Sequence, residues 1–359
     1  MQFIRRLAQN KKKVSKLNDL THKGTGEIET ERLLLRRFNM ADANEVFREW
    51  ASHENVAKYL PWKKHESIGE TKTYLLDAIG AYSRPDKYCW AAEHKKEGIL
   101  IGSISAEMTD EPKSAKAGYC FGERFWNCGY ATEALRAVSD YMFYDVNINR
   151  LEAYHSVENP ASGRVLQKAG YLKEGHMKQK YAAWNGIYQD ADVYGLVKDD
   201  FKKQYEPKIK EFLDVEKIKL SAYTIALKCT ELSPGIVIKN YVPGYKFNIT
   251  DKDAKTVFGE ISLRLGFSES LYYSGHIGYF VDERYRNAGV ATAACEIILN
   301  LAKAHGFKKI LITSDHANKA SRRVCEKIGA KLIRIAELPI WHALYAKGGR
   351  FECIYELSP

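Results

Sequence analysis

The sequence predicts a mixed α/β (α+β) chain built from two copies of one domain, and three observations support this. A chain of 359 residues with 45% hydrophobic and 12% aromatic content can fill two packed cores, since domains usually hold about 100–200 residues. A fifteen-residue block recurs 160 positions later in the chain. Each copy also has the same order of apolar strand, glycine turn and amphipathic helix.

The repeat is clearest between residues 118–132, GYCFGERFWNCGYAT, and 278–292, GYFVDERYRNAGVAT. The two blocks are identical at eight positions: Gly118/Gly278, Tyr119/Tyr279, Glu123/Glu283, Arg124/Arg284, Asn127/Asn287, Gly129/Gly289, Ala131/Ala291 and Thr132/Thr292. Further downstream the offset is 159, where Asn159-x-x-Ser162 matches Asn318-x-x-Ser321. Chance does not keep such a register through two separate blocks.

The elements follow in the same order in both copies. In the first copy, a hairpin of strands 88–94 and 99–108 precedes the repeat. Strands 117–121 and 277–281 lead into the glycine turns, and apolar residues at helical spacing follow from residues 131 and 291. Second strands (150–157 and 309–314) lead to short helices that end at Gly170 and Gly329. We expect helices that cross a mixed, mostly antiparallel sheet.

Charge and composition suggest four segments: a basic arm (1–27), a first domain (28–200), a solvated charged linker (201–219) and a second domain (220–359). Residues 1–26 carry six of the ten net positive charges, so the folded body is nearly balanced. A flexible arm is the simpler interpretation. An organelle transit peptide is one alternative. Contact of the arm with a nucleic acid or the ribosome is another, although no aromatic stacking platform accompanies the arm.

Several classes of protein are excluded by what the sequence does not contain. No run of 18 apolar residues occurs, so we expect no membrane-spanning helix. There is no P-loop and no dinucleotide-binding glycine motif. Seven scattered cysteines have no metal-site spacing, so we expect no metal and free thiols in a cytoplasmic protein. Nothing in the sequence specifies an oligomeric state.

The two glycine turns are typical of anion-binding sites. A strand followed by small residues and a helix N-terminus directs backbone N–H groups and the helix dipole at a ligand. Gly129 and Gly289 would let the backbone approach an anion closely, and Arg286 could add a charged contact. A simple tight turn is the alternative for either copy.

Both copies resemble the GNAT superfamily of acyl-CoA-dependent N-acyltransferases, whose loop reads [Q/R]-x-x-G-x-[G/A]. The second copy matches this loop as Arg286-x-x-Gly289-x-Ala291, whereas the first has Trp126 at the opening position. That departure is normal in the RimJ/RimL-like branch, which residues 28–201 resemble through 29-ETERLLLR-36, 59-YLPW-62 and 192-DVYGL-196. Residues 220–357 resemble another GNAT branch through 259-GEISLR-264 and 275-GHIGY-279.

The resemblance implies a V-shaped opening between two central strands that holds the pantetheine arm of acetyl-CoA, with the pyrophosphate on the glycine loop. Asn159 and Asn318 would contact pantetheine and Ser162 and Ser321 the cofactor further along, although these residues could instead cap their helices. The implied cofactor-binding residues are Phe121, Asn127, Cys128, Gly129, Tyr130, Ala131, Thr132, Asn159 and Ser162 in the first copy, and Val281, Arg286, Asn287, Ala288, Gly289, Val290, Ala291, Thr292, Asn318 and Ser321 in the second. A backbone N–H near Phe121 or Val281 would polarise the acyl carbonyl.

The catalytic residues are less well defined by the resemblance. The tyrosine that often protonates the leaving thiolate is replaced by Leu166 and Cys325. Cys325 could donate a proton or be an inert buried thiol.

His276 is the candidate base of the second copy, and Glu107 and His155 are the candidates of the first. Each could instead be an ordinary strand residue. Four aromatic residues could wall the acceptor cleft or belong to the core: Trp62, Tyr82, Trp90 and Trp184.

We therefore expect an N-acetyltransferase that moves an acetyl group from acetyl-CoA to a primary amine of a peptide N-terminus or a small molecule. A weak base favours such acceptors, because an α-amine with a pKa near 8 is partly neutral at pH 7, whereas a lysine amine is not. In the alternative, one domain is catalytic and the other is a non-catalytic acyl-CoA- or partner-binding module.

Overall fold

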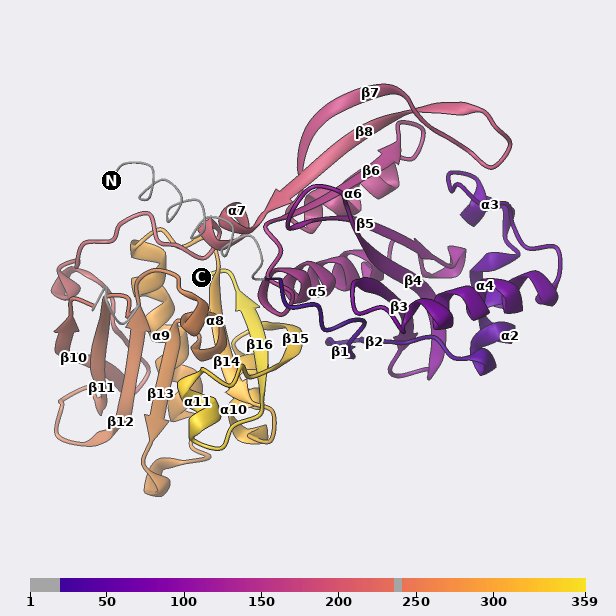
Figure 1. Cartoon of the computed structure of the whole chain (residues 1–359). Coiled ribbons are helices and arrows are strands. Elements are labelled where there is room, and N and C mark those ends of the chain that lie inside the picture. Colours follow the sequence, from indigo (N-terminus) through magenta and orange to yellow (C-terminus); the bar gives the residue numbers. More distant parts are fainter. Residues whose placement is uncertain (1–19, 236–240) are drawn as a thin grey trace, which may run out of the picture. The chain divides into compact units, whose positions relative to one another are not determined.

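The computed structural model describes residues 20–235 and 241–359, so most of the predicted basic arm lies outside the described residues. The chain divides into two compact units, unit 1 (Met1–Asp199) and unit 2 (Asp200–Pro359). Each unit contains one eight-stranded sheet among its described residues (Figure 1). Two tandem α/β domains are therefore confirmed.

Unit 1 has the sheet order β1-β2-β3-β4-β5-β6-β8-β7. Only β5 and β6 pair in parallel; every other pair in this sheet is antiparallel. Its elements are β1 Ile28–Glu29, β2 Leu33–Arg36, α2 Ala43–Val46, α3 Glu54–Ala57, α4 Ile68–Ala81, β3 Lys87–His94, β4 Ile99–Met108, β5 Ser114–Phe121, α5 Tyr130–Tyr144, β6 Arg150–Ser156, α6 Pro160–Lys168, β7 Leu172–Ala182 and β8 Tyr188–Val197.

Helices cover both faces of the unit 1 sheet. On one face, Tyr141 of α5 packs edge-on against the buried Trp90 of β3. On the other face, the segment with α2 and α4 buries Trp50 and Leu75 in a cluster that Cys120 of β5 also contacts. In Figure 1 the β7–β8 hairpin is long and curved.

Unit 2 has the sheet order β15-β16-β14-β13-β12-β11-β10-β9, again with one parallel pair, β13 and β14. Its elements are α7 Lys198–Lys203 at the boundary, β9 Ser221–Ala222, β10 Ile225–Ser233, β11 Gly244–Asp251, β12 Val257–Arg264, α8 Glu269–Ser274, β13 Ile277–Val281, α9 Val290–Ala304, β14 Ile310–Asp315, α10 Lys319–Lys327, β15 Lys331–Glu337, α11 Ala343–Ala346 and β16 Phe351–Leu357.

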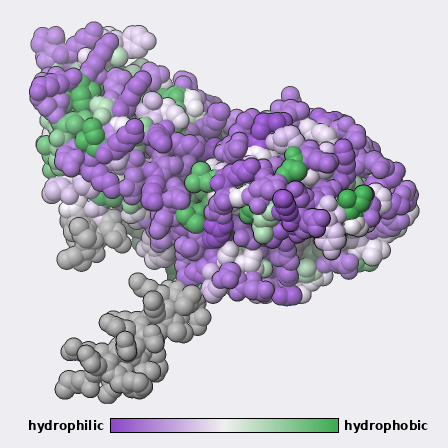
Figure 2. Space-filling view, turned by 90° about the horizontal axis from the view of Figure 1, so that it is seen from above, coloured by the Kyte–Doolittle hydropathy of each residue, from purple (hydrophilic) through white to green (hydrophobic). Residues whose placement is uncertain are grey.

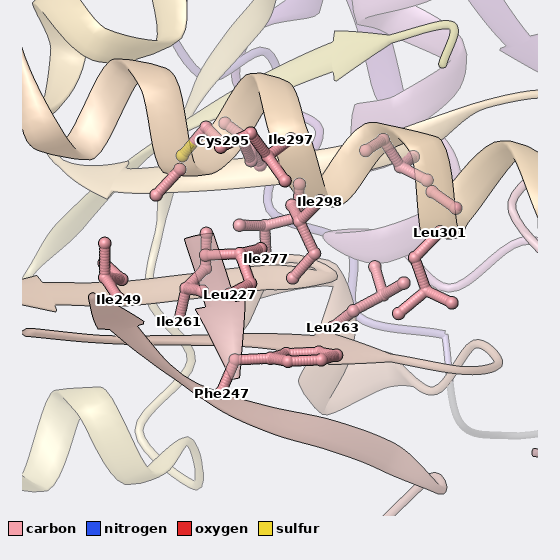
Figure 3. Close-up of a cluster of buried hydrophobic side chains, with 14 of the residues drawn as sticks. Leu227, Phe247, Ile249, Ile261, Leu263, Ile277, Cys295, Ile297, Ile298 and Leu301 are labelled. Atoms are coloured by element: carbon pink, nitrogen blue, oxygen red, sulfur yellow. The ribbon is translucent and has the colours of Figure 1, made fainter. Parts of the chain in front are cut away.

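The core of unit 2 lies between α9 and one face of its sheet. Ile298 and Leu301 of α9 point toward strand residues such as Ile261, Leu263 and Phe247 (Figure 3). The connection between the first long strand and the next differs between the units. In unit 1 residues 37–86 carry α2–α4, whereas in unit 2 only residues 234–243 join β10 to β11. Among its described residues, unit 2 therefore has no counterpart of α2–α4 in this connection.

The predicted helix boundaries are confirmed by their backbone geometry. Gly129 and Gly289 have φ angles of 83° and 79° and directly precede α5 and α9. Because only glycine adopts this left-handed region freely, it suits a sharp entry into a helix. Gly170 and Gly329 end α6 and α10 in the same way, with φ angles of 98° and 79°.

The end of the predicted arm and the predicted linker are both more ordered than we expected. At the end of the arm, Tyr141 donates to the carbonyl of Gly24, and Thr25 is buried. The solvated linker is wrong, because Tyr205 is 1% exposed, Lys208 donates its N–H to the carbonyl of His305, and Phe212 packs edge-on against Tyr245. Apolar residues among the charges, which the composition argument overlooked, make these contacts.

The part of the surface in view in Figure 2 is mostly hydrophilic, with small separate apolar patches. Among the described residues, no helix is both long and apolar enough to cross a membrane.

Candidate functional site

Both sheets open where their parallel strands part. In unit 1, β5 and β6 pair only from Ser114 with Arg150 to Lys116 with Glu152. In unit 2 the only pair is Ile277 with Ile312. The remaining residues of β5 and β13 have no strand partner on that side, so each sheet has the V-shaped opening that the resemblance implied.

The ladder pattern identifies which backbone groups line the opening. In antiparallel pairs, alternate residues exchange hydrogen bonds with the same neighbour. Gly122 donates to Ile101 of β4, so even-numbered residues of β5 bond β4, and Ala117, Tyr119 and Phe121 direct their N–H and C=O groups toward β6. By the same logic, Asp282 donates to Phe258, so Tyr279 and Val281 face the opening of unit 2.

The glycine loops lie at the wide end of these openings. Asn127 and Asn287 share the left-handed conformation of the following glycines, with φ angles of 60° and 63°. Within the described residues, the backbone N–H groups of residues 127–132 and 287–292 donate to no protein acceptor. Such a run of unengaged donors at a helix N-terminus is suited to bind phosphate.

Trp126 and Arg286 perform the same structural task despite their different chemistry. The indole N–H of Trp126 donates to the carbonyl of Phe121 at 2.7 Å. The Nε of Arg286 donates to the equivalent carbonyl of Val281 at 3.2 Å. In both units this bond ties the end of the strand to the loop. The departure from the family motif at Trp126 therefore keeps the hydrogen bond.

Arg32 supplies a positive charge at the loop of unit 1 that the sequence analysis did not assign. Its Nη1 donates to the carbonyl of Cys128 at 2.9 Å, and its guanidinium stacks 4.3 Å from the ring centre of Tyr130. The Nε of the same guanidinium also forms an ion pair with Oε2 of Glu133 of α5, at 2.7 Å. No sequence signal pointed to it, because nearly a hundred residues separate Arg32 from the loop.

The Asn-x-x-Ser pairs are helix caps and also reach the opening. The side-chain oxygens of Asn159 and Asn318 accept from the N–H groups of Ser162 and Ser321. Capping therefore occurs, but it uses only Oδ1, and each Nδ2 stays available as a donor. The cofactor contacts expected of these asparagines and serines remain predictions.

Tyr119 and Tyr279 hold these serines in place. Their hydroxyls lie 2.9 Å from the hydroxyls of Ser162 and Ser321. Burial raises the pKa of both phenols, so they stay protonated near neutral pH. The repeated Gly-Tyr pair in the sequence was the signal that could have identified them.

His276 and Cys325 have surroundings that favour a structural role. His276 is fully buried, its Nδ1 accepts from Leu311, and its Nε2 lies 3.0 Å from the carbonyl of Tyr205. Burial lowers its pKa to about 4. Cys325 is 1% exposed in the core, and burial raises the pKa of its thiol to about 12. Because both side chains are buried, an acceptor substrate that enters from solvent cannot contact either of them. We therefore do not propose either residue as catalytic.

The two candidates of unit 1 lie on opposite faces of the sheet. His155 faces α6 and is buried, with its Nδ1 2.7 Å from the carbonyl of Ser156. Glu107 lies on the other face, where β5 and β6 part. It is exposed and 3.3 Å from the Nζ of Lys116. Glu107 is the more accessible of the two.

The four aromatic residues do not gather in one cleft. Trp90 is fully buried and donates to Gly26, and the hydroxyl of Tyr82 bridges Phe38 and Cys89, so both belong to the core. Trp62 packs near His65. Trp184 lines a cavity in unit 1, with residues of the α3–α4 segment that include Glu54, Lys63 and Lys64. No His, Cys, Asp or Glu cluster in the described ranges could hold a metal ion.

The model of the acetyltransferase (GNAT) domain matches residues 32–172 and again 205–331. The chain is 31% identical over 172 residues to the uncharacterized N-acetyltransferase YoaA of Bacillus subtilis, covering 48% of this chain and 96% of that protein. It is 23% identical over 181 residues to the ribosomal protein uS5-alanine N-acetyltransferase of Escherichia coli, covering 48% and 92%. A solved GNAT-family acetyltransferase from Bacillus anthracis covers 48% of this chain and 99% of its own, with 28% identity and a TM-score of 0.44. The two family matches span most of the chain, one in each unit, and the chain therefore belongs to the acetyltransferase (GNAT) family and carries the domain twice.

Proposed function

We propose that the chain is an N-acetyltransferase with an acetyl-CoA site in each unit, and that unit 1 acetylates a primary amine such as a peptide N-terminus. The observation that carries this proposal is the duplicated opening. In each unit, unpaired strand backbone leads to a loop of unengaged N–H groups at a helix N-terminus. Acetyl-CoA would supply the activated acyl group as a thioester.

The residues present fit such a ligand. The free C=O group of Ala117 and the N–H and C=O groups of Tyr119 can bond the amides of an extended pantetheine arm, as an added strand would. The loop N–H groups after Phe121 can bind the pyrophosphate, with the guanidinium of Arg32 beside them. In unit 2, Tyr279 and the loop at Gly289 offer the same groups without an equivalent of Arg32.

The chemistry of unit 1 needs a group that attracts the amine and removes its proton. We assign both tasks to Glu107, because its carboxylate is exposed and lies beside the point where β5 and β6 part. It would act directly or through one water molecule. The Tyr119–Ser162 hydroxyl pair would donate the proton that the leaving thiolate needs, in place of the phenol that Leu166 replaces.

Calorimetric titration of acetyl-CoA into the full-length chain tests the proposal. We expect a stoichiometry near two. Gly129→Glu and Gly289→Glu should each reduce it to one, because a carboxylate in the loop repels the pyrophosphate and any side chain there is strained. Release of CoA thiol in the presence of an amine panel, including N-terminal peptides, would then report turnover.

Gly170→Glu and Gly329→Glu are matched controls. Both glycines have positive φ angles and open space around them, like Gly289, but they end helices away from the loops. These variants carry the same strain and the same charge and should keep both sites. A chain that binds no acetyl-CoA at either loop would overturn the proposal, and a single site would favour one catalytic unit beside a non-catalytic module.

The acceptor of the Escherichia coli relative is the alanine of a ribosomal protein, which supports peptide N-termini as the first acceptors to test for unit 1. We also propose that the chain works in the cytoplasm. All seven cysteines are free thiols, as is usual in a reducing compartment.

A further inference from the structure

Corresponding positions beside the two openings carry opposite charges. Ser105 and Ser262 each donate a hydroxyl hydrogen bond to the carbonyl of the equivalent glycine, Gly118 or Gly278. These bonds align the two strands, so that Glu107 in unit 1 corresponds to Arg264 in unit 2. The residue that we assign as the base of unit 1 therefore has a cationic counterpart in unit 2.

Arg264 lies directly over the strand that borders the opening. Its guanidinium Nη2 is 3.2 Å from the position that a Cβ on Gly278 would occupy. Nη1 donates to the carbonyls of Ser274 and Gly275 at 3.2 and 2.9 Å. Among the described residues, no carboxylate lies within ion-pair distance of this guanidinium, and burial lowers its pKa. Arg264 is thus a half-buried cation without a counter-ion.

Glu352 of β16 is a buried carboxyl group that, like Arg264, has no partner of opposite charge among the described residues. Its side chain belongs to a residue that is only 5% exposed, and no donor in the described part of the chain bonds its carboxyl group. Its partner across the ladder is Asp315 of β14. Burial and the Asp315 charge raise the pKa of Glu352 to about 8. In unit 1 the corresponding residue is Ala191, which pairs with Ser156.

Both groups lie on the same face of the sheet and on either side of the opening. Leu263 and Cys353 face the core under α9 and α10; side chains alternate along a strand, so Arg264 and Glu352 face the other way. The order β16-β14-β13-β12 puts the opening between them. On this face α8 packs over β14 and β16, with Thr313 donating to the carbonyl of Tyr273, and the aromatic rings of Tyr273 and Trp341 lie 6.2 Å apart.

We propose that unit 2 takes a free α-amino acid as its acceptor, with Arg264 binding the carboxylate and Glu352 receiving a proton from the amine. The uncompensated cation of Arg264 matches the carboxylate of such a molecule, and the carboxyl group of Glu352 can accept the amine proton once it is ionised, which its raised pKa places near pH 8. This inference rests on the proposed acetyl-CoA site of unit 2. In the transfer, the ammonium group first gives one proton to ionised Glu352. The neutral amine nitrogen then forms the new bond to the acetyl carbon, the bond from that carbon to sulfur breaks, and the second amine proton passes to the leaving thiolate, so that CoA leaves as the thiol.

The test uses the full-length Gly129→Glu chain, in which only the loop of unit 2 is intact. Thiol release from acetyl-CoA is measured with the twenty L-amino acids and with the decarboxylated amine of each. We expect at least one amino acid to be used with a kcat/KM about tenfold or more above that of its amine, the range that a hydrogen-bonded charge pair supplies. Calorimetric binding of that amino acid to the CoA-saturated chain gives a readout that does not depend on turnover.

Two variants separate the roles of the two residues. Arg264→Gln should raise KM for the amino acid and abolish its calorimetric binding, while activity on the decarboxylated amine is unchanged. Glu352→Gln should lower kcat and leave CoA binding intact. Lys246→Gln is the control, because it removes an exposed positive charge from the neighbouring strand β11 and should change neither quantity.

The outcomes distinguish this inference from the function on which it rests. If the Gly129→Glu chain binds no acetyl-CoA, the proposed second site fails, and this inference fails with it. If acetyl-CoA binds but amino acids are neither bound nor preferred over their amines, the acceptor assignment alone is wrong.

Discussion

The two units share the side of the site that would hold the cofactor and differ on the side from which an acceptor would arrive. The strand opening, the glycine loop, the Asn-led helix and the tyrosine–serine pair occur in both. On the opposite face, unit 1 has α2–α4 and Glu107, whereas unit 2 has neither, and Arg264 takes the place of the carboxylate. The difference supports our proposal of one cofactor and two acceptors.

The largest expected effect comes from the position that corresponds to Lys116 in unit 1 and His276 in unit 2. His276→Ala leaves the N–H of Leu311 without an acceptor and opens a cavity. We expect it to lower the free energy of unfolding of unit 2 by about 2–4 kcal/mol. Hydrogen exchange followed on peptides of each unit measures this.

Lys116→Ala in unit 1 is the matched control for this prediction. Lys116 is partly exposed and ion-paired at the surface, so its loss should change stability by less than about 0.5 kcal/mol. Equal effects at the two positions would contradict the structural role of His276.

A second contrast concerns the contact between α6 and β6. A Cβ on Gly163 would lie 2.5 Å from Nε2 of His155, whereas unit 2 has Arg322 and Ser314 at these positions. Gly163→Ala should therefore destabilise unit 1 by about 1–3 kcal/mol, measured by urea denaturation. Adding His155→Ser should restore most of that loss. If Gly163→Ala alone stabilises the chain, as it would in an open helix, the contact is not tight.

The third contrast is the pH dependence that Glu352 gives to unit 2. Its pKa is about 8 in the folded chain and near 4.3 when unfolded. Between these values the unfolded chain loses a proton that the folded chain keeps, so stability falls as pH rises from about 5 to 8. Asp315 of β14, its partner across the ladder, is the charged group that raises its pKa further.

Glu352→Gln removes this titration. The variant should gain stability relative to the natural chain between pH 5 and 8, by on the order of 1–3 kcal/mol after allowance for partial solvent access. Thermal unfolding at several pH values measures the difference. Parallel pH curves for Glu352→Gln and the natural chain would contradict the raised pKa.

The smallest expected effect tests the bond that the units make with different residues. Trp126→Phe and Arg286→Met each remove one donor to the carbonyl at the end of the strand. Each should cost about 1 kcal/mol and weaken acetyl-CoA binding about fivefold in its own unit only, measured by calorimetry. Trp126→Arg should keep the bond and most of the affinity. Loss of affinity in the other unit would show that the sites are coupled.

The sequence by itself determined the features that depend on neighbours along the chain. The two copies, the left-handed glycines before α5 and α9, and the asparagine caps all follow from local backbone rules, because each involves residues within one or two turns. The hairpin of β3 and β4 and the positions of the repeated strands were predictable for the same reason, although β5 begins at Ser114, three residues before the expected start. The departure from the family motif at Trp126 could also be read from the sequence, although the hydrogen bond that Trp126 makes could not.

Only the tertiary structure decided which residues meet across the sheet. His276 looked like an accessible base until β14 and Tyr205 enclosed its ring. Residues 201–219 looked solvated because their charges outnumber the few apolar side chains that anchor them. Arg264 and Glu352 lie far apart in the sequence, and they come to flank one opening because strand order and face alternation are set by packing over the whole domain.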